Sequence, residues 1–129
     1  MRYISTRGQS PAVGFADAVL GGLAPDGGLY VPQAWPAFPR AEIAAFAGKP
    51  YAEVAAAVFG KFAGDEISSA DMARMCAEAY ASFSHKAVVP MVQVGPQAFI
   101  AELFHGPSLA FKDVAMQILA RLYDHLLGL

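Results

Sequence analysis

Apolar and polar residues alternate over short stretches near the start of the chain, and this pattern predicts two strands. Positions 2–6 alternate and contain β-forming side chains, and positions 29–31 form a second short apolar run. The turn signal Pro25-Asp26-Gly27-Gly28 precedes the second run. Arg7 and Asp26 beside these strands are expected to make local hydrogen bonds and to leave substrate binding to other residues.

Helical periodicity dominates the region between and after these strands. Phe15, Val19 and Leu23 recur every four residues and predict a helix from about Pro11 to Leu20. Three further helices are delimited by proline, glycine and a capping box: 39–48, 50–64 and one starting at 68–71. The expected core faces are Tyr51, Val54, Val58 and Phe62 on the second of these, and Met72, Cys76, Ala79 and Phe83 on the third.

The spacing of apolar residues changes again at His85-Lys86, where strand-like segments begin. Residues 88–94 and 98–104 are apolar and extended, and the intervening Gly95-Pro96-Gln97 predicts a hairpin. Gly106 and Pro107 then form a tight connection into a last helix, for which Ser108 is the expected N-cap. The chain is therefore expected to be a mixed α/β protein.

The last helix carries a lysine on its apolar surface. Lys112, Met116, Leu119 and Tyr123 form one expected strip, beside Phe111, Ala115, Ile118 and Leu122, whereas Asp113, Gln117, Arg121 and Asp124 form a polar one. Burying the charge of a lysine side chain costs several kcal/mol of stability unless the charge is paired or the group loses its proton. Three explanations remain open: Lys112 snorkels or pairs with Asp113 or Glu102, it is kept neutral and nucleophilic as Schiff-base chemistry requires, or the helix is differently phased.

Composition and charge exclude several classes of protein. The 129 residues are 56% hydrophobic and 16% charged, so some apolar surface is expected to contact a partner segment. A net charge of −2 argues against nucleic acid as a partner. The single cysteine, Cys76, lies on an apolar helix face and is expected to be a buried hydrophobe, with neither a disulfide framework nor a metal cluster. The chain shows no secretory signal and no membrane-spanning run, so a cytoplasmic location is expected.

Three motifs carry a resemblance to a known family. His-Gly-Pro-Ser-Leu-Ala-Phe-Lys-Asp at 105–113 closely resembles the pyridoxal-phosphate lysine motif of the threonine synthase family. Ser-Thr-Arg-Gly at 5–8 and Asp-Gly-Gly-Leu-Tyr-Val-Pro at 26–32 resemble that family's amino-terminal domain. The motifs occur in the family's order and at about its spacing, and together they span essentially the whole chain.

This resemblance implies a fold-type II enzyme that uses pyridoxal 5'-phosphate to convert O-phospho-L-homoserine and water to L-threonine and phosphate. It implies that Lys112 binds the cofactor covalently and serves as the catalytic base, and that Phe111 packs beside the cofactor. We also expect Ser108, or a backbone amide of its turn, to contact a phosphate at the positive end of the helix. For His105 we expect structural hydrogen bonds, and a direct role near the cofactor is the alternative.

The resemblance further implies a division of the chain. Residues 1–84 would form the family's amino-terminal domain of short strands and alanine-rich helices, and residues 85–129 the first strands and lysine helix of the catalytic domain. No glycine-rich run long enough to hold the cofactor phosphate occurs. We therefore expect an amino-terminal fragment that needs the rest of the catalytic domain and is inactive by itself. Another fold-type II lyase or dehydratase, and a non-catalytic interaction module, are the alternatives.

Overall fold

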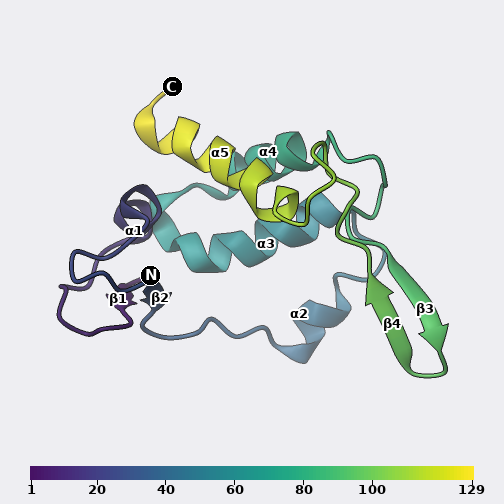
Figure 1. Ribbon diagram of the computed structural model, residues 1–129, viewed down its shortest axis with the longest axis horizontal. Helices are drawn as coiled ribbons and strands as arrows, with labels where there is room; N and C mark the ends of the chain where they lie inside the picture. Colours follow the sequence, from purple (N-terminus) through teal and green to yellow (C-terminus); the bar gives the residue numbers. More distant parts are fainter.

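The computed structural model describes residues 1–129 as a group of helices flanked by two small antiparallel sheets (Figure 1). This arrangement confirms the expected mixed α/β class. The strands are β1 (Tyr3–Ser5), β2 (Tyr30–Pro32), β3 (Met91–Gly95) and β4 (Ala98–Ala101). The helices are α1 (Phe15–Gly21), α2 (Arg40–Ala44), α3 (Tyr51–Ala63), the 3-10 turn η1 (Gly64–Glu66), α4 (Ser69–Tyr80) and α5 (Asp113–Leu127).

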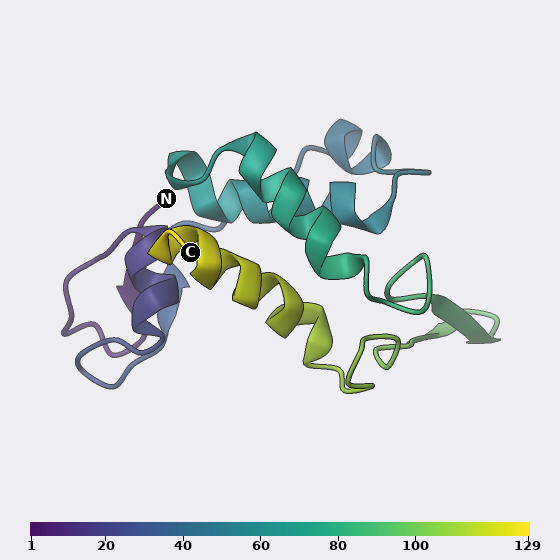
Figure 2. The same ribbon diagram turned by 90° about the horizontal axis from the view of Figure 1, so that it is seen from above.

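Helix α4 is the centre of the core, because it packs against both α3 and α5 (Figure 2). Its inward residues Met72, Met75, Cys76 and Ala79 are at most 1% exposed. The Ser68 hydroxyl accepts a hydrogen bond from the Asp71 N–H at 3.0 Å, which confirms the predicted N-cap. The expected core face of this helix is confirmed as well.

The expected core face of α3 is confirmed at Tyr51, which packs against the core, and is wrong for Val54, Val58 and Phe62. The buried residues of α3 are Ala55 and Ala63, whereas the predicted Val54 and Val58 are only half-buried. Alanine has the smallest side chain that still favours a helix, so the alanine face permits the close approach of α4. The larger side chains on the adjoining face then lie at the margin of the contact.

The two predicted amino-terminal strands are confirmed, but the first helix starts later than predicted. β1 and β2 pair antiparallel, with Tyr3 opposite Pro32 and Ser5 opposite Tyr30. Val13 also pairs with Tyr3, so the segment before Gly14 is extended and α1 begins at Phe15 instead of near Pro11. α1 packs against α3 and α5, and the Tyr123 hydroxyl of α5 donates to the Val19 carbonyl at 3.0 Å. One core therefore includes residues from both parts of the chain.

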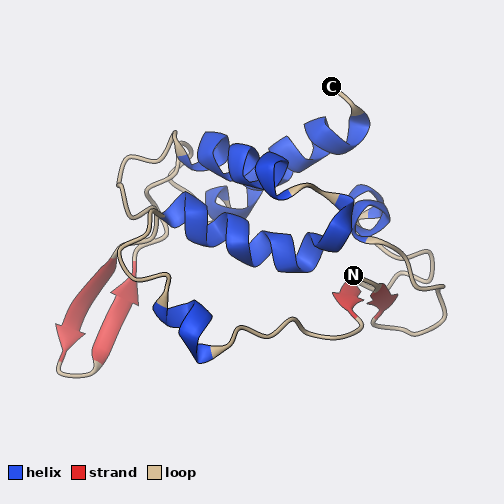
Figure 3. Ribbon diagram, turned by 180° about the vertical axis from the view of Figure 1, so that it is seen from behind, coloured by secondary structure: helices blue, strands red, loops and turns tan.

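The predicted hairpin is present and extends away from the helices (Figures 1 and 3). β3 and β4 pair antiparallel, with Met91 opposite Ala101 and Val92 opposite Ile100. Large apolar side chains on it are more than two-fifths exposed, namely Met91, Val92, Val94, Phe99 and Ile100. None of the helices has the length and apolar content that crossing a lipid bilayer requires.

Candidate functional site

The lysine motif lies in the loop that joins β4 to α5, and two backbone hydrogen bonds anchor the first part of this loop. The Glu102 N–H donates to the Pro90 carbonyl at 3.0 Å, and the Ser84 N–H donates to the His105 carbonyl at 2.9 Å. The first bond connects the loop to the start of β3, and the second connects it to the segment after α4. The loop therefore has a defined position relative to the helical core before it enters α5.

Helix α5 begins at Asp113, four residues later than predicted, and Ser108 is not its N-cap. Leu109 has a left-handed backbone conformation with φ 63°, which no helix of L-residues can include. Lys112 occupies the N-cap position, and its carbonyl accepts the Met116 N–H at 2.8 Å. The lysine consequently precedes the first turn of α5 instead of lying within the helix.

Lys112 is exposed within this chain, and its expected burial in a covered apolar surface stays a prediction. The buried residues of α5 that face the other helices are Ile118 and Leu122, while Met116, one turn after Lys112, is 53% exposed. The Lys112 side chain makes no ion pair, so of the three explanations the one that pairs it with Asp113 or Glu102 does not hold in this chain. This chain thus presents an exposed lysine side chain without an ion pair at the start of α5.

Asp113 was expected on the polar stripe of the helix, but it is only 5% exposed. Its carboxylate accepts the Ser108 hydroxyl and the Ser108 N–H, both at 2.8 Å. Burial raises the pKa of Asp113, but the hydrogen bonds from Ser108 and Gln117 outweigh this effect and hold the pKa below its usual value. The carboxylate is therefore ionised and engaged by the loop.

Glu102 and His105 form a pair beside the lysine loop. Their Oε2 and Nε2 atoms are 2.7 Å apart, and both side chains are largely buried. The His105 ring also lies 5.2 Å from the His85 ring and 4.7 Å from the Phe104 ring, measured between centroids. These contacts confirm the expected structural hydrogen bonding of His105, and a direct role near the cofactor stays the alternative.

The other predicted site residues lie in the same loop. Phe111 directly precedes Lys112 and is 64% exposed, so its ring is available to a bound group. Ser108 is exposed, but its hydroxyl and its N–H both donate to Asp113. Contacts of Phe111 and Ser108 with a cofactor stay predictions.

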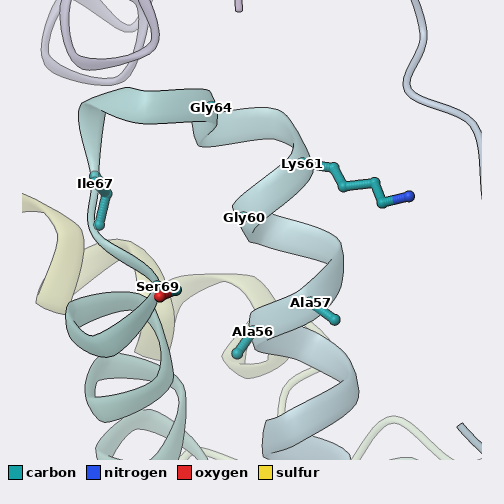
Figure 4. Close-up of a pocket in the computed structure, with 7 residues that line it drawn as sticks. All are labelled: Ala56, Ala57, Gly60, Lys61, Gly64, Ile67 and Ser69. Carbon is teal, nitrogen blue, oxygen red and sulfur yellow. The ribbon is translucent and has the colours of Figure 1, made fainter.

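The largest hollows of the surface lie away from this loop. A groove of about 410 Å³ runs beside α3, η1 and the start of α4, lined mostly by small residues such as Ala56 and Gly60 (Figure 4). Lys61 also lines this groove, and its Nζ lies 2.6 Å from Glu42 Oε2. Cys76 is fully buried, and burial raises the pKa of its thiol to about 11, so it is no nucleophile at neutral pH. These features supply no reactive group.

Comparison with known proteins gives a consistent result for sequence and structure. Residues 2–80 match the family described as threonine synthase N terminus. Over 99% of its length the chain is 52% identical to threonine synthase of Pseudomonas aeruginosa, covering 27% of that protein. It also superimposes on PLP-bound threonine synthase from Brucella melitensis with a TM-score of 0.95 and 57% identity, covering 99% of this chain and 28% of that one. Threonine synthase from yeast gives a TM-score of 0.90 at 35% identity, over 98% of this chain and 26% of that one. The chain thus spans about a quarter of the length of the proteins it matches.

Proposed function

Since the chain belongs to the threonine synthase family, we propose that it contributes the cofactor lysine of an enzyme that converts O-phospho-L-homoserine and water to L-threonine and phosphate. The proposed cofactor is pyridoxal 5'-phosphate, which is bound in the threonine synthase structure from Brucella melitensis. The single observation that carries the proposal is the position of Lys112, an unpaired amine in the family's lysine motif.

The surroundings of Lys112 fit an aldehyde cofactor. Pyridoxal phosphate, when bound, condenses with amino groups and stabilises carbanions as an electron sink. An amine that is engaged in an ion pair would resist such condensation, and Lys112 has no such pair. Phe111 and Met116 are exposed and apolar on either side of it, so they can flank an aromatic ring.

Lys112 would also perform the acid–base steps. With the substrate amine held by the cofactor, the Lys112 Nζ would take a proton from the substrate Cα and transfer protons at Cβ. The Glu102–His105 pair fixes the loop before the lysine but has no contact with Nζ. Lys112 is accordingly the sole proton-transfer residue that this chain is proposed to contribute.

The exposed apolar surface supports an incomplete catalytic domain. Hairpin residues such as Phe99 and Ile100 are 54% exposed, and Leu109, Phe111 and Met116 near the lysine are all at least 53% exposed. Strands that are apolar on both faces are typical of sheets covered on both sides. We therefore assign residues 85–129 to the start of the cofactor domain, whose remainder would cover this surface and bind the phosphate groups.

Borohydride trapping in the full-length protein tests this proposal. The protein is incubated with pyridoxal phosphate and reduced, and the labelled lysine is identified by mass spectrometry. We expect selective labelling of Lys112, with Lys49, Lys61 and Lys86 as internal controls. Lys112→Ala should abolish this label and lower phosphate release from O-phospho-L-homoserine by about 100- to 10,000-fold or more. Equal labelling of all four lysines would overturn the assignment.

Substrate competition separates the alternative lyase. The full-length protein is assayed with O-phospho-L-homoserine, serine and threonine in parallel. We expect phosphate release from the first and no comparable ammonia release from the other two. A preference for serine or threonine would instead identify a dehydratase, while failure to bind the cofactor at all would favour a non-catalytic module.

A further inference from the structure

We propose that Asp113 is a positioning residue: its carboxylate holds the 106–112 loop closed and thereby sets where Lys112 leaves the start of α5. The contacts of Asp113 are a property of this chain, but the consequence for catalysis depends on the function proposed above for Lys112. No contact joins Asp113 to the Lys112 amine, so Asp113 acts through the loop.

The carboxylate is buried in a loop that is otherwise mostly exposed. Asp113 is 5% exposed, whereas Ser108, Ala110 and Lys112 are all exposed. A buried carboxylate is stable only when its oxygens accept hydrogen bonds. Here Oδ2 accepts the Ser108 N–H and Oδ1 accepts the Ser108 hydroxyl. The two bonds clamp a residue five positions earlier against the first residue of the helix.

The pair of hydrogen bonds between Ser108 and Asp113, here called the clamp, leaves no space for a side chain at position 106. Gly106 is buried, and a Cβ at this position would overlap the Asp113 side chain, with Cγ only 2.7 Å away. The Gly106 carbonyl also accepts the Leu109 N–H at 3.1 Å. Glycine at 106 is therefore needed so that the chain can pass directly against the carboxylate.

The clamp also accounts for an unfavourable backbone conformation. Leu109 has φ 63° and a 72% exposed side chain, so its own contacts with this chain do not explain the left-handed conformation. Such residues persist where the surrounding structure determines the backbone. Leu109 follows Ser108, whose hydroxyl and N–H both donate to Asp113, and the helix starts four residues after Leu109. Lys112 lies within this closed segment, so its Cα position depends on the clamp.

Three variants of the full-length protein separate positioning from charge. Asp113→Ala removes both hydrogen bonds and the charge. Asp113→Asn removes the charge but can still accept the Ser108 N–H and donate its amide to the Ser108 hydroxyl. Asp124→Asn removes an exposed carboxylate from the same helix and is the matched control.

The first readout is hydrogen exchange of the cofactor-free protein. We expect Asp113→Ala to increase exchange in residues 106–112 while α3 and α4 keep their protection, and Asp113→Asn to remain near the wild type. The second readout is the rate at which pyridoxal phosphate and borohydride label Lys112, which should fall about 10- to 100-fold in Asp113→Ala and at most about 3-fold in Asp113→Asn. The Asp124→Asn control should match the wild type in both.

Different results contradict the two proposals. If Asp113→Asn is as impaired in labelling as Asp113→Ala, the charge is what matters and positioning is overturned. Unchanged hydrogen exchange in Asp113→Ala would also overturn the positioning proposal. If Asp113→Ala fails to fold, Ser108→Ala takes its place, because this variant removes one of the two hydrogen bonds. Absence of Lys112 labelling in the wild type would contradict the proposed function, while the exchange experiment would still test the clamp.

Discussion

At the scale of single residues, Asp26 organises the amino-terminal scaffold through its carboxylate. Oδ1 accepts the Ser5 hydroxyl at 2.6 Å and the Gly28 N–H at 2.9 Å, and Oδ2 accepts the Gln9 N–H at 3.0 Å. The hydrogen bond from Ser5 is the largest influence on the pKa of Asp26, which is lowered to about 2. Arg7 adds a bond to the Asp26 carbonyl, so the expectation of local hydrogen bonding at both residues is confirmed.

This low pKa predicts a specific dependence of stability on pH. The carboxyl group titrates at its ordinary value of 3.8 in the unfolded chain and near 2 in the folded one. Its contribution to the free energy of unfolding is therefore fully present above about pH 5 and is lost as the pH falls from about 4 to about 2. We expect Asp26→Asn to lower the urea midpoint at pH 7 and to lose this difference progressively toward pH 2.

Urea unfolding of the full-length protein from pH 7 to pH 2 checks this expectation. Asp17→Asn, which removes an exposed carboxylate from α1, is the control for the loss of one charge. A difference between wild type and Asp26→Asn that stays constant down to pH 2 would be incompatible with the lowered pKa.

At the scale of elements, the start of α1 is capped by a residue from a distant part of the chain. Gly14 at its N-cap has no side chain to accept a hydrogen bond. Instead the Phe15 and Ala16 N–H groups donate to the Glu66 carboxylate of η1, at 2.7 Å and 3.0 Å. A carboxylate there satisfies two free N–H groups and interacts favourably with the helix dipole. Glu66 thereby connects α1 to the turn between α3 and α4.

Removing this distant cap should be measurable. We expect Glu66→Ala to lower the free energy of unfolding by about 1 kcal/mol, as loss of an N-cap does, and Glu66→Gln to lower it less, since the amide keeps one acceptor. Urea unfolding of the full-length protein gives both values. The control Asp65→Ala removes the neighbouring exposed carboxylate and should have little effect. If Asp65→Ala lowered the free energy of unfolding as much as Glu66→Ala, negative charge near η1 would stabilise α1, and the specific cap would not.

At the scale of the whole molecule, the apolar residues divide into a core and an exposed surface. The core around α4 includes residues from β1 to α5. The exposed surface includes the hairpin together with Phe104, Leu109 and Phe111, each at least 52% exposed. Many large exposed apolar side chains in one part of the chain are typical of an interface. The chain therefore has a core of its own and a surface that fits the proposed contact with the rest of the catalytic domain.

This division predicts how the 129-residue chain behaves when it is produced by itself. We expect it to bind the dye ANS, to associate with itself in light scattering, and to release no phosphate from O-phospho-L-homoserine. Replacing Phe99 and Ile100 by serine and threonine should weaken dye binding and self-association. The matched control Ile43→Ser alters an exposed apolar residue of α2 and should change neither; turnover by the isolated chain would contradict the expected need for the remaining domain.

The sequence by itself determined the elements whose signals are local. Pro50 and Gly64 delimit α3 as predicted, Ser68 caps α4, and Gly95-Pro96-Gln97 lies at the hairpin turn. Each of these signals acts within about four residues, through capping, turn preference or fixed φ, so no distant contact is needed to interpret it. The motif at 105–113 indicated the family for the same reason, because it is a continuous segment.

Only the tertiary structure decided which groups these elements bring together. Ser108 was the expected N-cap by local preference, but the buried Asp113 accepts hydrogen bonds from both its donors, and the N-cap of α5 is Lys112, four residues later. Glu66 caps a helix about 50 residues away, and the alanine face of α3 is buried because α4 packs there. Hydrogen bonds and packing between distant segments depend on how the whole chain is arranged, so no periodicity or spacing along the sequence specifies them.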